Sequence, residues 1–78
     1  MEQSVLVFSV GKRKQTAVAV QNVLTEFARC IRTRVGFHNA EPDGGLIVLE
    51  LMGKKEDYKK LADALGKVEG IRTQLVTL

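Results

Sequence analysis

The sequence of 78 residues has little of what most metal, redox and nucleic-acid sites require, with one cysteine, one histidine, no tryptophan and 5% aromatic residues. The single cysteine, Cys30, cannot form an internal disulfide, so we expect a reduced, cytoplasmic setting. No apolar run approaches the ~20 residues of a membrane span, so we expect no transmembrane segment. Residues 1–3 are acidic and the apolar stretch after them is too short for an export core, so we expect no signal peptide.

The few candidate ligands and nucleophiles form no recognisable catalytic or metal-binding pattern. Cys30, His38, Glu41 and Asp43 are loosely grouped, but there is no CxxC motif and no paired histidine. A metal site would therefore need further ligands from a second subunit. One cysteine and one histidine without a third orienting group give no basis for nucleophilic catalysis. Residues 11–16 lack the spaced glycines of a phosphate-binding loop, although a helix start beside a basic turn could attract an anion. We therefore expect no enzyme, no metal and no cofactor.

The composition indicates one small folded domain over residues 1–78. The apolar fraction of 45% excludes a disordered tail. A chain this short buries only about 60–65% of the surface that its unfolded form exposes, and such domains often gain stability by oligomerising. The net charge is +3, with basic residues grouped over residues 12–14 and 29–34. These groups could bind an anion or a nucleic acid, although the simpler interpretation is that they are solvent-exposed surface residues.

Hydrophobic periodicity predicts the order strand, helix, strand, strand, helix, strand. Residues 4–10 form a near-continuous apolar run bounded by Gly11, which is typical of a strand covered on both faces. Turn-forming residues over 39–45 predict a long hairpin loop, and the segment Leu65–Ile71 combines a helix stop, a reversal and a strand start. The expected elements are a strand over 4–10, a helix from about Gln15 or Thr16 to Cys30 with Ala17 on its buried stripe, strands over 31–38 and 46–52, an amphipathic helix over 54–68 and a strand over 71–78.

This order is that of an α+β, ferredoxin-like βαββαβ fold, a four-stranded antiparallel sheet with two helices on one face. The helices can cover only one face, yet the strands over 4–10 and 46–52 are apolar on both. Strand propensity alone could explain this pattern, but we favour a second buried face and expect a homo-oligomer, a dimer or tetramer, through that face or a sheet edge. The pattern leaves open whether Phe8 and its neighbours at alternate positions, or Val7 and Val5, face the helices. Phe8 is the only aromatic on these two strands, which argues against an RNA-recognition module.

In the next predicted strand, alternation places Ile31 on one face with Thr33, Val35 and Phe37. Arg32, Arg34 and His38 then share the other face.

Three segments, Arg34–Phe37, Gly45–Val48 and Leu65–Ile71, resemble the iron-only hydrogenase system regulator family. That family is similar in fold to ACT domains and to the C-terminal, ligand-sensing domain of the nickel-responsive repressor. The resemblance implies a stand-alone, ACT-like regulatory domain that acts in transcription in an anaerobic bacterium. Residues 38–44 depart from the basic, tyrosine-containing loop of the family, and no nickel-site histidine set is present.

We therefore expect a non-enzymatic, homo-oligomeric module that binds a small effector at a subunit interface. ACT-type modules bind ligands near the first strand-to-helix turn. The sequence has no helix-turn-helix segment, so direct sequence-specific DNA binding is not expected of this chain alone. The alternatives are a purely structural oligomerisation domain without a ligand, and a small acylphosphatase-like enzyme, for which a convincing arginine–asparagine pair is lacking. The candidate effector-binding residues are Gly11, Lys12 and Arg13 at the first turn and Arg34, Gly36 and His38 near the hairpin.

Overall fold

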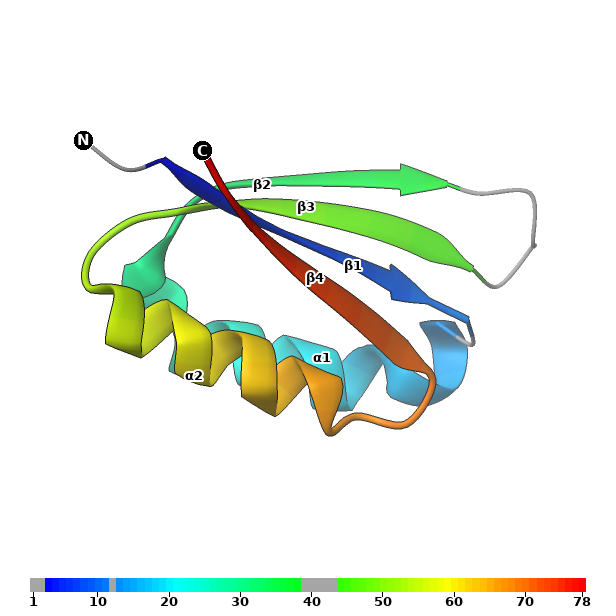
Figure 1. Ribbon diagram of the computed structural model, residues 1–78. Helices are drawn as coiled ribbons and strands as arrows, with labels where there is room; N and C mark the ends of the chain where they lie inside the picture. Colours follow the sequence, from blue (N-terminus) through cyan, green and yellow to red (C-terminus); the bar gives the residue numbers. More distant parts are fainter. Residues whose placement is uncertain (1–2, 12, 39–43) are drawn as a thin grey trace.

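The structure, a computed structural model, describes residues 3–11, 13–38 and 44–78, and for residues 13–15 and 38 it describes the backbone only. Its four strands form one antiparallel sheet in the order β2-β3-β1-β4, and both helices lie on one face of that sheet (Figure 1). The α+β, ferredoxin-like βαββαβ architecture is therefore confirmed. The elements are β1 (Ser4–Val10), α1 (Arg13–Glu26), a 3-10 turn η1 (Ala28–Cys30), β2 (Ile31–His38), β3 (Gly45–Leu51), α2 (Lys55–Gly66) and β4 (Ile71–Thr77).

The central strand β1 turns its larger side chains toward the helices. Leu6 and Phe8 are fully buried and Val10 is 3% exposed, whereas Val5 and Val7 on the other face are half-buried. This decides the question that the apolar pattern of β1 leaves open. The core is completed from α1 by Val20 and Leu24, from α2 by Tyr58, Leu61 and Leu65, from the other strands by Leu49, Leu51 and Ile71, and by Cys30.

The edge strand β2 contains an irregularity that its sequence pattern does not show. Ile31 lies opposite Leu51 but Thr33 lies opposite Glu50, so β2 advances two residues where β3 advances one. Such a bulge reverses the alternation of side chains. Ile31 therefore packs against the core, and its predicted place on the same face as Thr33 is wrong. Arg32 is left without a register partner on β3.

Helix α1 begins earlier than predicted, and its buried stripe contains Thr16 in place of Ala17. Thr16, Val20 and Leu24, spaced at i, i+4 and i+8, are buried, whereas Ala17 is exposed. The predicted place of Ala17 on the buried stripe is therefore wrong. The helix ends at Glu26, and the last turn before Cys30 is 3-10 rather than α-helical.

The predicted reversal after α2 is confirmed. Gly70 adopts a φ of 86°, a left-handed conformation that favours glycine. Gly11 N donates a hydrogen bond to Gly70 O at 3.3 Å, which joins the β1–α1 turn to the α2–β4 turn. The predicted hairpin loop over residues 39–45 lies largely outside the described residues.

The sheet face away from the helices is not covered by any described part of the chain (Figure 1). We call this surface the open face. Val35 and Phe37 of β2 are 43% and 53% exposed there, and Val48 lies between Val35 and Val7 in the register. Strand alternation places on the open face the apolar residues Val5, Val7, Val35, Phe37, Leu46, Val48 and Val76, with Ser9, Thr33, Glu50, Arg72 and Gln74.

Candidate functional site

Of the predicted effector-binding residues, Gly11, Gly36 and His38 lie at or near one end of the sheet, whereas Arg34 lies further along β2, opposite Leu49. His38 pairs with Gly45 and Gly45 pairs with Val10, so the end of β2 and the end of β1 share one row of the sheet. Gly11 directly follows that row. Strand pairing therefore brings the first turn and the hairpin, which are far apart in the sequence, to the same end of the sheet.

Three of the six predicted residues fall outside this description in whole or in part. Lys12 lies outside the described residues, and Arg13 is described only as the first backbone position of α1. The side chain of His38 is likewise outside the described part. Gly11 already donates its N–H to Gly70 O, so this group is engaged within the protein.

Arg34 and Gly36 lie on the helix-facing side of β2, opposite Leu49 and Ile47. They line an open hollow of about 290 Å³, together with Val10, Gly45, Ile47, Phe37 and Leu46. Arg34 Nη1 donates to Gln21 Oε1 of α1 at 3.3 Å, which steadies the guanidinium at the rim. A Cβ built on Gly36 would meet no atom within 4 Å, so the space beside its backbone is open. One cation beside an apolar floor suits a small anionic ligand with an apolar part.

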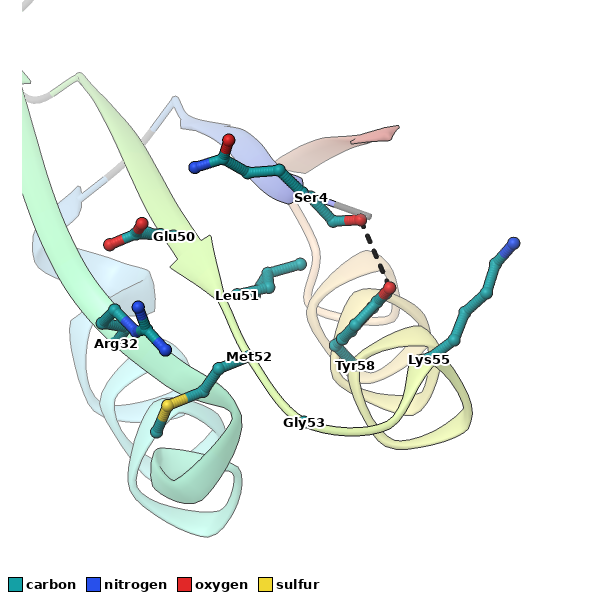
Figure 2. A pocket seen from close by; sticks show the side chains of 9 residues that line it. Ser4, Arg32, Glu50, Leu51, Met52, Gly53, Lys55 and Tyr58 are labelled. Carbon is teal, nitrogen blue, oxygen red and sulfur yellow. Dashed lines mark hydrogen bonds between the residues drawn. The ribbon is translucent and has the colours of Figure 1, made fainter. Parts of the chain in front are cut away.

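A larger hollow lies at the opposite end of the sheet, where β3 leads into α2 (Figure 2). We call it the β3–α2 pocket; its volume is about 630 Å³. The sequence did not predict this pocket. Arg32 lines it from the bulge in β2, and the alternation of apolar and polar residues in the sequence does not reveal a bulge. Its lining residues are Gln3, Ser4, Arg32, Glu50, Leu51, Met52, Gly53, Lys55 and Tyr58.

Cys30 lies in the core and is 3% exposed. Burial raises the pKa of its thiol above the ordinary value of 9.0, the carboxylate of Asp57 raises it further, and Arg29 acts in the opposite direction. A buried thiol with a raised pKa is a poor nucleophile. A role for Cys30 in packing follows.

Within residues 3–11, 13–38 and 44–78, no cluster of three or more His, Cys, Asp or Glu side chains could hold a metal ion. Glu41 and Asp43, two of the loosely grouped ligands in the sequence, lie outside these residues. None of the helices described here is long and apolar enough to cross a membrane.

Comparison with known proteins finds the same fold among solved structures. The protein TM1266 from Thermotoga maritima, itself uncharacterized, is 26% identical with a TM-score of 0.88, over 100% of this chain and 99% of that chain. The ACT domain of the GTP pyrophosphokinase of Chlorobium tepidum is 23% identical with a TM-score of 0.68, over 100% and 97%. CPII from Thiomonas intermedia, a nitrogen regulatory PII-like protein, is 10% identical with a TM-score of 0.64, over 100% and 90%. The last two similarities show the fold alone.

A search among curated proteins gave no match. The family model of the TM1266-like iron-only hydrogenase system regulators matches residues 4–75, nearly the whole chain. That match supports a regulatory role. The chain belongs to the TM1266-like family of iron-only hydrogenase system regulators.

Proposed function

We propose that this protein is a non-enzymatic regulatory module of the cytoplasm that assembles as a homo-oligomer through its open face and senses a small effector. The observation that carries the proposal is the apolar character of that face. Monomeric soluble proteins rarely expose a contiguous apolar patch larger than a few hundred Å². Here the middle row of the face contains the three valines Val35, Val48 and Val7 side by side.

The two charges on the open face favour one arrangement of the two copies. Glu50 shares a row with Val5, whereas Arg72 lies opposite Ser9, four residues further along β1. A two-fold axis that runs across the strands brings the Arg72 end of one copy over the Glu50 end of its partner. An axis along the strands would instead bring Glu50 ends together, where like charges repel. Two such sheets would pack face to face about 10 Å apart.

The effector site is proposed at the hollow beside Arg34 and Gly36; Gly11, Lys12, Arg13 and His38 are its further candidate residues from the sequence. β2 is an edge strand, so a second subunit can complete this hollow. Phe37 belongs to the open face and also lines the hollow beside Gly36. A ligand that orders this part of β2 would therefore also act on the interface. An effector that binds one assembly better than another shifts the population toward it, and such a shift can pass to a transcriptional partner protein.

The interface is tested by Val48→Glu, with Val18→Glu as a matched control, because Val18 is 74% exposed on α1. Light scattering of the wild type should give a multiple of 8.6 kDa. Val48→Glu should give the monomer mass with its circular dichroism retained, and Val18→Glu should keep the wild-type mass. A monomeric wild type contradicts the proposal, and an oligomer that only Val18→Glu disrupts would move the interface to α1.

The effector is tested by a thermal-shift screen of amino acids, metals and nucleotides. A ligand at a hundred times its dissociation constant stabilises the folded state by about 2.7 kcal/mol. We expect Arg34→Gln to reduce the shift and Arg29→Gln, an exposed arginine outside the hollow, to leave it unchanged. If no compound in the screen shifts the melting temperature, the result would favour a structural oligomerisation domain without a ligand.

A further inference from the structure

We propose that the β3–α2 pocket is a separate binding site for a small organic anion, a carboxylate or a phosphate ester, attracted by the charges of Arg32 and Lys55 on the two sides of the pocket. The pocket lies at the far end of the sheet from the proposed effector site. Its volume of about 630 Å³ falls in the range of small-molecule sites, about 300–1,000 Å³.

Two backbone irregularities place the cations at this pocket. The bulge between Ile31 and Thr33 frees Arg32 from register with β3, and bulges commonly redirect a side chain toward a site. Gly53, with a φ of 87°, makes the bend from β3 into α2, and Lys55 opens the helix. In Figure 2, Arg32 and Lys55 lie on opposite sides of the segment 51–53.

The charges of the pocket are not balanced within the protein. Neither Arg32 nor Lys55 makes an ion pair or side-chain hydrogen bond with any other described residue. Glu50 is the one carboxylate among the lining residues, and its Oε1 already accepts a hydrogen bond from Thr33 Oγ1 at 2.8 Å. Two cations against one carboxylate leave the pocket with a charge of +1, which favours a negatively charged ligand.

The pocket also borders a chain of three hydroxyl groups. Ser4 Oγ lies 3.2 Å from Tyr58 Oη and 3.0 Å from Thr77 Oγ1, and Ser4 and Tyr58 are 3% and 5% exposed. Three hydroxyls supply three O–H donors, but the two contacts use only two of them. When the chain runs from Thr77 through Ser4 to Tyr58, the Tyr58 O–H remains to donate to a ligand oxygen. Leu51 and Met52 provide an apolar wall for the body of the ligand.

The test is a titration of the ¹⁵N-labelled protein with succinate, lactate and inorganic phosphate, followed by amide chemical shifts. We expect saturable shifts centred on Gly53, Lys55 and Tyr58 for at least one of these anions. Arg32→Gln and Lys55→Gln should each weaken binding about tenfold, which corresponds to about 1.4 kcal/mol. Lys59→Gln removes an exposed cation of the same helix that does not line the pocket, and should leave the affinity unchanged.

Equal losses in Lys59→Gln and Lys55→Gln, or shifts that never saturate, would overturn the site and indicate non-specific charge attraction. The lining residues all belong to one chain, so Val48→Glu should retain binding, and Arg34→Gln should do so because Arg34 does not line this pocket. Failure of the oligomer or of the proposed effector site is thus distinguishable from failure of this pocket.

Discussion

Ser4 Oγ and Tyr58 Oη, 54 residues apart in the sequence, lie 3.2 Å apart in a buried contact that ties β1 to α2. The second contact of Ser4, with Thr77 Oγ1 at 3.0 Å, extends the tie to β4. The two ends of the chain and the second helix therefore meet at one hydroxyl group. This group borders the β3–α2 pocket, so stability and binding can be probed with the same side chains.

Tyr58→Phe should reduce the free energy of unfolding by about 0.5–1.5 kcal/mol, the usual value for one hydrogen bond. We expect the lower part of this range, because Ser4 keeps its contact with Thr77. Ser4→Ala should cost more, since it deprives both Tyr58 and Thr77 of this partner. Urea denaturation measures both variants, and a larger loss in Tyr58→Phe than in Ser4→Ala would contradict this account.

Gly70→Ala should destabilise the protein by about 1–2 kcal/mol, the cost of a left-handed backbone for a residue with a Cβ. The φ at Gly70 is 86°, and a Cβ there would meet no atom within 4 Å, so the backbone alone sets the cost. Gly36→Ala is the matched control, with equal space and no positive φ. It should change the melting temperature little, and equal losses at both glycines would contradict the explanation.

Phe8→Ala and Val7→Ala should separate the two faces of β1. Phe8 is fully buried toward the helices, so its truncation should cost about 3–5 kcal/mol at any protein concentration. Val7 faces the open face, so its truncation should matter chiefly where the oligomer is populated. Denaturation at low and high protein concentration measures this difference. A concentration-independent effect of Val7→Ala would argue against its burial between subunits.

Cys30 should make the protein less stable at high pH. Its raised pKa, caused by burial first and by Asp57 next, means that the folded state holds the thiol proton more tightly than the unfolded state. This contribution is complete below the unfolded-state pKa, near 9, and is lost as the pH rises through the folded-state pKa. Urea denaturation from about pH 7 to about pH 10 should show a steeper decline above about pH 9 for the wild type than for Cys30→Ala. If stability declined with pH equally in the wild type and in Cys30→Ala, the raised pKa of Cys30 would be contradicted.

Much of the fold could be predicted from the sequence because its signals are local. The apolar run over residues 4–10, the alternation along residues 71–77, the stripe of Tyr58, Leu61 and Leu65, and the reversal at Gly70 each depend on neighbouring residues. Elements and their order follow from such signals. The candidate site was predictable only in part. Arg34 and Gly36 line a hollow as neighbours on one strand, whereas the β3–α2 pocket gathers residues from four separate segments.

The sequence by itself determined the βαββαβ order and the apolar character of both sheet faces, since periodicity records which residues share a face. Only the tertiary structure decided which face meets the helices, why Ile31 turns inward while Thr33 turns outward, and that Arg32 and Lys55 line one pocket. These outcomes depend on a bulge set by pairing with β3 and on the volume that Phe8 and Leu6 fill beneath the helices. Such effects act between segments far apart in the chain, so no local pattern contains them.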